Sequence, residues 1–187
     1  MNAEPFRPTL WRTCRVLANA TRLRIFAQLV RRQPQSVSQL ADCVSLTLPV
    51  ASQSLRALES RGLLQVKRIR LRVEYRIPST TEAEALSDLI AALKTALRRE
   101  PLPIARIIKL ATAFTHPSRI HIYRCLTDGQ KTQRQIQSAF PISGPALSRH
   151  VGKLIARGFV ESDRNGRCLA IKHNHAIGRA LAALAVA

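Results

Sequence analysis

The stretch Ser143–Cys168, "SGPALSRHVGKLIARGFVESDRNGRC", decides how its part of the chain folds. Apolar residues recur in it at helical spacing and form one face: Leu147, Val151, Leu154 and Ile155. Ser143 is placed to cap this helix, and Pro145 stands in the first turn, where its missing N–H costs nothing. Gly158 then ends the helix, and the alternating residues that follow predict a β-hairpin that turns at Asn165 and Gly166.

The same organisation occurs about 96 residues earlier in the chain. "NATRLRIFAQL" (Asn19–Leu29) aligns with "HPSRIHIYRCL" (His116–Leu126) at an offset of 97, and the segment 46–64 aligns with 142–160 at an offset of 96. The second pair of segments keeps its proline near the start and its Arg-Gly at the end, here Arg61 and Gly62. Because two separated blocks keep both their marker residues and their spacing, we interpret the chain as an internal duplication of one small domain.

Each copy has the same expected order of elements: two helices, a short helix, the capped helix described above or its counterpart, and a β-ribbon. A long amphipathic helix is expected over 80–99 and a short Ala/Leu-rich helix over 176–185. Pro101 and Pro103 mark the boundary between the copies. The predicted fold is mainly α with small β-hairpins, arranged as two tandem winged helix-turn-helix domains. We assign residues 1–100, with the long connecting helix, to the first domain and residues 101–187 to the second.

The charge of the chain is strongly positive. Its 187 residues hold 30 basic and 11 acidic side chains, a net charge of +19, with +9 in residues 1–100 and +10 in residues 101–187. This excess indicates a polyanion as partner, nucleic acid or an anionic membrane, rather than only a solvated Arg-rich surface. No stretch approaches the roughly 18–20 apolar residues that span a bilayer, and the N-terminus lacks the apolar core of a signal peptide.

The four cysteines are widely separated: Cys14, Cys43, Cys125 and Cys168. This pattern is typical of a reducing cytoplasm, and we expect these thiols to be mostly small core residues. The sequence contains no cluster of metal ligands, so we expect no metal and no cofactor. The run His173–His175 is interpreted as a turn or cap before the last helix. No catalytic triad, carboxylate pair or phosphate-binding loop is present, and we expect no enzymatic activity.

Three helices followed by a β-ribbon are the layout in which one helix enters the major groove of DNA and the ribbon contacts the backbone. The recognition-helix candidates are Thr47, Ser52, Gln53 and Arg56 in the first copy and Ser143, Ser148, Arg149 and Lys153 in the second. The ribbon, or wing, candidates for phosphate contact are Lys67, Arg68, Arg70 and Arg72 in the first copy and Arg164, Asn165 and Arg167 in the second. Arg and Lys donate to guanine and Gln pairs with adenine, so both helices carry groups that read bases.

The runs "NATRLRIF" and "SRHVGKLIARGFV" resemble the ArsR-type winged-helix transcriptional regulators, and the resemblance covers both copies. It implies a DNA-binding dimer of winged helices that acts as a repressor. Most members of that family are single-domain homodimers, whereas this chain joins two copies. Many members also bind metal through a cysteine pair in the helix before the recognition helix. Here that helix reads "VSQLADC", with Cys43 alone, and its counterpart "QRQIQSAF" has no cysteine.

The sequence therefore predicts a cytoplasmic regulator that binds specific sites on double-stranded DNA with two winged helices as a pseudo-dimer. A homodimer through the 80–99 helix and the C-terminal helix is possible in addition. Two alternatives stay open: a non-specific, nucleoid-type DNA-binding protein, and a winged-helix module that binds protein or RNA. The apolar entry to the first recognition helix, "SLTLPV", also leaves open that this copy has a structural or dimerising role.

Overall fold

The computed structural model describes residues 9–70, 72–99, 101, 103–163, 168–172 and 176–186. The described chain is mainly helical, with two small antiparallel sheets. The elements of the first half are α1 (Leu10–Leu17), α2 (Ala20–Arg31), β1 (Gln35–Ser36), α3 (Val37–Val44), α4 (Leu48–Glu59), β2 (Gln65–Ile69), β3 (Arg72–Arg76) and α5 (Glu84–Leu97). Those of the second half are α6 (Ile104–Ala111), α7 (Pro117–Cys125), β4 (Lys131–Thr132), α8 (Gln133–Ala139), α9 (Gly144–Ala156), β5 (Val160–Ser162), β6 (Cys168–Ile171) and α10 (Ala176–Val186).

Each half contains a three-stranded sheet, and the two sheets have the same topology. The strand orders are β1-β3-β2 and β4-β6-β5, with antiparallel pairing throughout. The sequence predicted two-stranded ribbons, so the prediction missed β1 and β4. Both strands are only two residues long, which is too short to produce the alternating pattern by which a strand is recognised.

The same local devices recur 96 residues apart. Ser36 and Gln39 form a capping box at the start of α3, and Thr132 and Gln135 form one at the start of α8. In each box the hydroxyl accepts from the third helical N–H and the glutamine accepts from the N-cap N–H. The two halves therefore begin their short helix in the same way.

The glycines that end α4 and α9 also correspond. Gly62 and Gly158 have φ of 68° and 77°, the left-handed region that glycine enters at little cost. The next residue in each case donates its N–H to the carbonyl of Leu58 or Leu154, which closes the helix end. The predicted glycine stops are confirmed.

Two expectations about helix starts differ from the structure. Thr47 and Ser143 occupy the N-cap positions of α4 and α9, but neither side chain makes a capping hydrogen bond. The proline in the first turn removes one of the N–H groups that such a cap would receive. The helix expected over 80–99 begins only at Glu84, after an extended segment that includes Thr81, whose hydroxyl bonds to Ser87.

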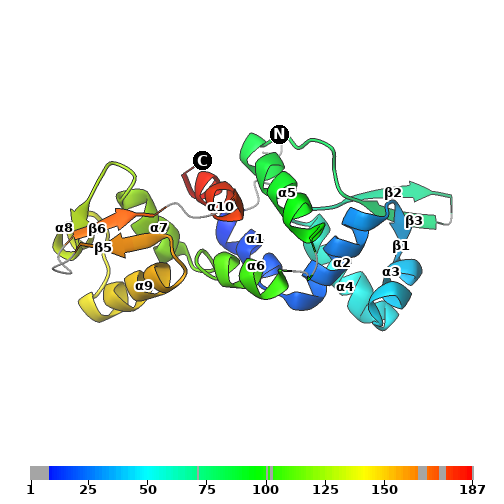
Figure 1. Ribbon diagram of the computed structural model, residues 1–187, viewed down its shortest axis with the longest axis horizontal. Coiled ribbons are helices and arrows are strands. Elements are labelled where there is room, and N and C mark those ends of the chain that lie inside the picture. The colour runs from blue at the N-terminus through cyan, green and yellow to red at the C-terminus, as the bar shows by residue number, and fades with distance from the viewer. Residues whose placement is uncertain are drawn as a thin grey trace, which may run out of the picture.

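The helices α1, α5, α6 and α10 join the two halves. Helix α5 packs along α10, and α1 packs on α6, so each contact joins elements in corresponding positions of the two halves. Figure 1 shows these four helices in the middle of an elongated molecule, with the sheets at its two ends. The stripe predicted for α5 is buried: Leu86, Leu89, Ile90, Leu93 and Leu97.

Buried apolar residues from both halves form one continuous cluster. The predicted division at residues 100 and 101 follows the sequence repeat, but residues 1–100 and 101–187 share one hydrophobic core. The faces considered for a homodimer, on α5 and α10, cover each other within the chain.

Cys14 is fully buried in this core, but Cys43 is exposed and Cys125 and Cys168 are partly exposed. The expectation that most of the thiols are core residues is wrong.

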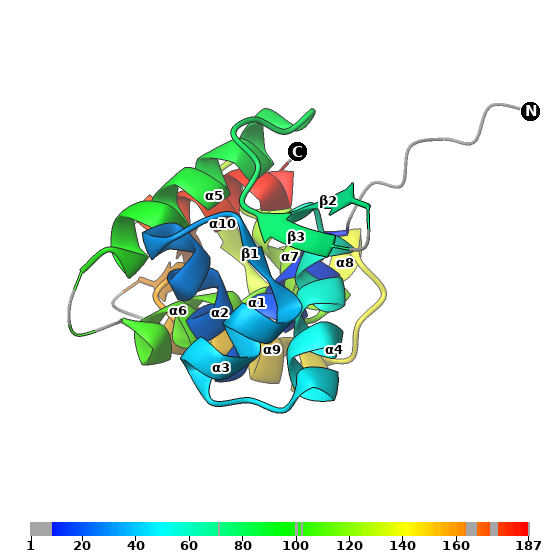
Figure 2. The same ribbon diagram turned by 90° about the vertical axis from the view of Figure 1, so that its right-hand side faces the viewer.

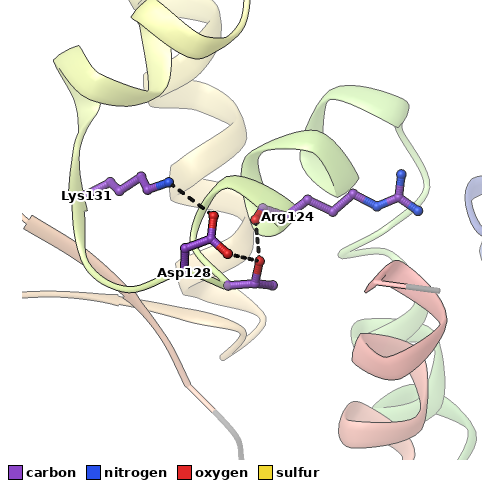
Figure 3. Close-up of polar contacts among 4 residues, drawn as sticks. Arg124, Asp128 and Lys131 are labelled. Carbon is purple, nitrogen blue, oxygen red and sulfur yellow. Dashed lines mark hydrogen bonds and ion pairs between the residues drawn. The ribbon is translucent and has the colours of Figure 1, made fainter.

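Helix α7 is tied to the end of α10 by a side chain. The Nε of Arg124 donates to the carbonyl oxygen of Ala185, one of the last carbonyls of α10, where a cation is favourable. Figure 3 shows the Arg124 side chain extending toward that helix, while Asp128 lies just past the same C-terminal end of α7, its carboxylate 3.7 Å from the ammonium of Lys131. The hydroxyl of Thr127 donates to the Arg124 carbonyl and so closes the C-terminus of α7.

The shared core predicts that the halves unfold together. Leu93 is fully buried on the α5 stripe, so Leu93→Ala should lower the free energy of unfolding by about 2–5 kcal/mol. Trp11, the chain's one tryptophan, lies in α1, whereas far-UV circular dichroism reports all helices. Urea transitions followed by both signals should coincide and shift together.

A matched control is Leu48→Ala, because Leu48 is 56% exposed and its truncation leaves no cavity. Two separate transitions, of which Leu93→Ala moves only one, would contradict a shared core.

Candidate nucleic-acid interface

Helix α4 buries one face and presents the other to solvent. Ala51, Leu55 and Leu58 are fully buried against the first half, and Ser54 lies among them. Of the predicted residues, Gln53, Arg56 and Thr47 are exposed and Ser52 is half-buried. The free face of α4 therefore carries an amide and a guanidinium, the two kinds of donor that read adenine and guanine.

Two exposed apolar side chains at the start of α4 were not among the predicted site residues. Leu48 is 56% exposed and Val50 is 42% exposed, on either side of the face that carries Gln53. The apolar run "SLTLPV" contained this signal. A sequence alone does not tell whether an apolar residue in the first turn points into the core or away from it.

Helix α9 has the same arrangement. Its buried residues are Leu147, Val151 and Leu154, and the predicted residues Ser143, Ser148, Arg149 and Lys153 are exposed. Ile155 is 40% exposed, so its predicted place on the buried face is wrong. Gly152 also lies on the free face, where a Cβ atom would meet nothing within 4 Å.

The hydroxyl of Ser148 makes a contact that the sequence did not predict. It donates to Oε1 of Gln133 at 3.3 Å, which links the start of α9 to the start of α8. Ser148 is thus partly engaged within the second half, and Arg149 and Lys153 are the cationic groups that α9 presents.

The β2–β3 hairpin of the first half is basic along its length. Lys67, Arg68, Arg70 and Arg72 are all exposed. Contact with phosphates requires this exposure, and the contact itself stays a prediction. Ile69 pairs with Arg72, and Arg70, which follows Ile69, takes φ of 53°. The corresponding wing of the second half joins β5 to β6. Its predicted residues, Arg164, Asn165 and Arg167, lie outside the described residues, so these assignments stay predictions.

The two recognition-helix candidates lie on one side of the molecule. Figure 1 and Figure 2 both place α4 and α9 on the side opposite α5, and Figure 1 places them toward opposite ends of the long axis. The sequence could not predict this relation, since it depends on how α5 and α10 join the halves.

Two histidines pack together, His116 just before α7 and His150 within α9. The rings of His116 and His150 lie with centroids 4.6 Å apart, and Nδ1 of His116 accepts from the Ser118 N–H at the start of α7. Nδ1 of His150 is buried and has no hydrogen-bond partner among the residues that the structure describes. The sequence left open whether His150 faces the groove or its own half, and the ring contact places it against its own half.

Burial lowers the pKa of both imidazoles. The guanidinium of Arg119 and the ammonium of Lys153 lower it further by repulsion, and His116 and Arg149 do the same to His150. Both imidazoles are therefore harder to protonate than an ordinary histidine, because they lie next to several cationic side chains.

The segment between α6 and α7 fixes the base of the second half. Arg119 is buried, and its guanidinium donates to the Ala113 carbonyl, to the Thr112 carbonyl at 3.2 Å and to the Thr115 hydroxyl at 2.6 Å. Arg157, at the end of α9, donates from Nε to the Thr112 hydroxyl at 3.0 Å. Burial and the Arg157 charge lower the pKa of Arg119. These contacts hold α7 and the end of α9 against the same loop.

No group of three or more His, Cys, Asp or Glu residues that could hold a metal ion occurs in the part of the chain that the structure describes. Burial raises the pKa of the Cys14 thiol, which keeps it protonated within the core. None of the described helices has the length and apolar character needed to cross a membrane.

Residues 17–67 match the sequence family described as "Helix-turn-helix domain". The match runs from the end of α1 through α2, α3 and α4 into β2, so it includes the free face of α4 with Gln53 and Arg56. The first half therefore contains a helix-turn-helix domain, which indicates a DNA partner and a role in transcription regulation. Comparison with curated proteins and with solved structures gives no match.

The histidine pair predicts how stability depends on pH. Both folded-state pKa values lie below the ordinary 6.5, so near that pH the unfolded chain binds more protons than the folded protein. The free energy of unfolding should be highest above about pH 6.5 and fall as the pH drops through the folded pKa values. In His150→Phe a ring still faces His116 but one titrating group is gone, so the decrease should be smaller.

Urea unfolding at about pH 7.5 and about pH 5.5 measures this difference. His121→Phe is the matched control, because it makes the same replacement at a histidine whose ring contacts Phe140 instead of a second histidine. The same loss of stability in wild type and His150→Phe would exclude the pair as its cause.

Proposed function

We propose that this protein is a sequence-specific, duplex-DNA-binding transcription regulator that uses both halves as a pseudo-dimer of winged helices. The observation that carries the proposal is the placement of α4 and α9 on one side of the molecule, each with a free face that presents hydrogen-bond donors, Gln53 and Arg56 on α4 and Arg149 and Lys153 on α9. Two recognition helices at opposite ends of one face suit successive major grooves of a single duplex. By its resemblance to ArsR-type regulators, the protein acts as a repressor.

The pseudo-dimer is supported by which helices join the halves. In a two-fold dimer, the elements next to the symmetry axis contact the same elements of the partner. Here α1 contacts α6 and α5 contacts α10, and the members of each pair stand in corresponding positions of the two halves. The second half also keeps the strand order, the capping box and the glycine stop of the first. We therefore propose that the second half is a second winged helix-turn-helix domain and that the chain arose by duplication.

Charge supports DNA as the partner. The net charge of +19 is spread over both halves, and the described wing presents four exposed cations next to the helix-turn-helix match. Such side chains bind phosphates and release counterions, whatever the base sequence. The proposal is for binding without catalysis, in the cytoplasm. Non-specific nucleoid-type binding and a protein- or RNA-binding module are the rival functions that the following test separates.

Arg149 and Arg68 should have different roles on DNA. We propose that Arg149 on α9 donates to a base edge, so Arg149→Ala should reduce specific binding by about 1–3 kcal/mol and relax preference at one position. Arg68 on the wing contacts phosphate in this proposal, so Arg68→Ala should weaken binding to all duplexes. It should also lower the slope of log K against log salt by about 1.

The measurement is a salt titration of binding to a site selected from random duplex and to unselected duplex. Equal weakening of both DNAs by Arg149→Ala would favour the nucleoid-type function. Absence of duplex binding by the wild type would favour the protein or RNA module.

The two helices present different groups to the groove, so we propose that they read different half-sites. At the start of α4 stand Leu48 and Val50, and the corresponding residues of α9 are Gly144 and Ala146. On α4, the exposed apolar side chains can contact thymine methyl groups and the Gln53 amide can pair with adenine. On α9, Arg149 can donate to guanine. The target is then an A·T-rich half-site joined to a G·C-containing one.

Replacing thymine by deoxyuridine in the half-site bound by α4 should weaken binding, because it removes the methyl groups that Leu48 and Val50 contact in this proposal. The expected loss is about 0.8 kcal/mol, or roughly fourfold, for each buried methyl. The double variant Leu48→Ala with Val50→Ala should remove most of the difference between the two DNAs. The same replacement in the other half-site is the control, and equal losses at both half-sites would contradict the assignment.

A further inference from the structure

A cavity of about 610 Å³ lies where the two halves meet. It is lined by the C-terminal part of α5, the start of α6 and the start of α10, with Pro101 and Pro103 between α5 and α6. Its volume is within the range of sites that hold a small organic molecule. The cavity lies away from α4 and α9 and has no part in the DNA interface described above.

The cavity has an apolar wall and a cationic rim. Ala92 and Ala96 of α5, Ile107 and Leu110 of α6, and Ile177 of α10 form its apolar part. Three arginines also line the cavity: Arg99 just after the end of α5, Arg106 of α6 and Arg179 of α10.

The lining residues that the structure describes include no carboxylate. Arg99 and Arg179 at the rim repel a cationic guest, whereas an anionic guest would form charge-assisted hydrogen bonds with them. The apolar wall in turn favours a ligand with a hydrocarbon or aromatic body, because inorganic anions would leave it in contact with water.

Two helix starts add to this preference. Helices α6 and α10 both have no acidic residue in their first turn, and Pro103 makes no side-chain cap for α6. The partial positive charge of these helix ends adds to the arginine charges at the mouth of the cavity.

We propose that this cavity binds a small organic anion, a carboxylate carried on an apolar body. The carboxylate lies between Arg99 and Arg179, and the body lies against Ala92, Ala96 and Ile107. This binding does not depend on the proposed DNA function, since it uses only the junction between the halves.

A ligand in this cavity would also influence DNA binding. It contacts α5 from the first half and α6 and α10 from the second, so its binding free energy depends on how the halves are placed. The placement of the halves also sets the distance between α4 and α9. On the proposed function, ligand and DNA then change each other's affinity by the same factor.

The test is isothermal titration calorimetry of the full chain with decanoate, below its micelle concentration and without DNA. Decylammonium has the same alkyl chain with a cationic headgroup, and acetate has the headgroup without the chain. We expect decanoate to bind with a stoichiometry of one and both controls to bind at least tenfold more weakly, as loss of a charge-assisted contact or of the apolar body implies. Equal binding of decanoate and decylammonium would overturn the proposal.

Variants locate the site. Arg99→Gln and Arg179→Gln should each weaken decanoate about tenfold, and Thr95→Trp should fill the cavity and block binding. Arg98→Gln is the matched control, because Arg98 is an exposed neighbour of Arg99 outside the cavity lining. All four positions are exposed, and thermal unfolding checks that each variant folds. Full affinity in Thr95→Trp, or equal losses in Arg98→Gln and Arg99→Gln, would show that decanoate binds the basic surface at large.

A last measurement separates this proposal from the proposed function. The affinity for a selected duplex is measured with and without saturating decanoate, in wild type and Thr95→Trp. A change in wild type that is absent in Thr95→Trp supports coupling between the cavity and DNA. Decanoate binding with unchanged DNA affinity would contradict the coupling, and decanoate binding by a protein that binds no DNA would leave the cavity proposal standing while the DNA function fails.

Discussion

The packing of α5 along α10 is the interaction on which the rest of the structure depends. Leu89, Leu93 and Leu97 are fully buried on α5, and Leu181 and Ala185 are fully buried on α10. Neither half could leave such a stripe in water without exposing a large apolar surface. With the two stripes covering each other, and α1 covering α6, the halves become one body with a shared core. The distance and orientation between α4 and α9 follow from this contact.

Much of the fold could be predicted because the sequence marks its helices clearly. Periodic leucines located α4, α5 and α9, and Gly62 and Gly158 located two helix ends, since each lies at a positive φ that other residues avoid. The two-residue strands β1 and β4 could not be predicted, because two residues are too few to show the alternation of apolar and polar side chains that is typical of a strand. The packing of α5 on α10 within one chain could not be predicted either. An apolar stripe on a helix shows that the helix is covered, but it does not show which surface covers it.

The candidate site could be predicted in part, for a similar reason. Side chains opposite a buried stripe are exposed, and this placed Gln53, Arg56, Arg149 and Lys153 correctly on free helix faces. The rule fails at helix ends and at the edges of a stripe. Leu48 and Ile155 are exposed although both are apolar. Contacts between distant segments, such as His116 with His150, depend on tertiary packing and leave no pattern in the sequence.

Both halves of the proposed pseudo-dimer belong to one chain, so the occupancy of a DNA site depends on the protein concentration in a different way than for two separate subunits. Two separate subunits must first find each other, so at low abundance the assembled form falls as the square of the total concentration. Here the α5–α10 contact forms within one molecule, at an effective concentration that dilution does not change. Occupancy of a DNA site by this protein would then rise in simple proportion to the number of chains, and a cell holding only a few copies would keep every one of them assembled.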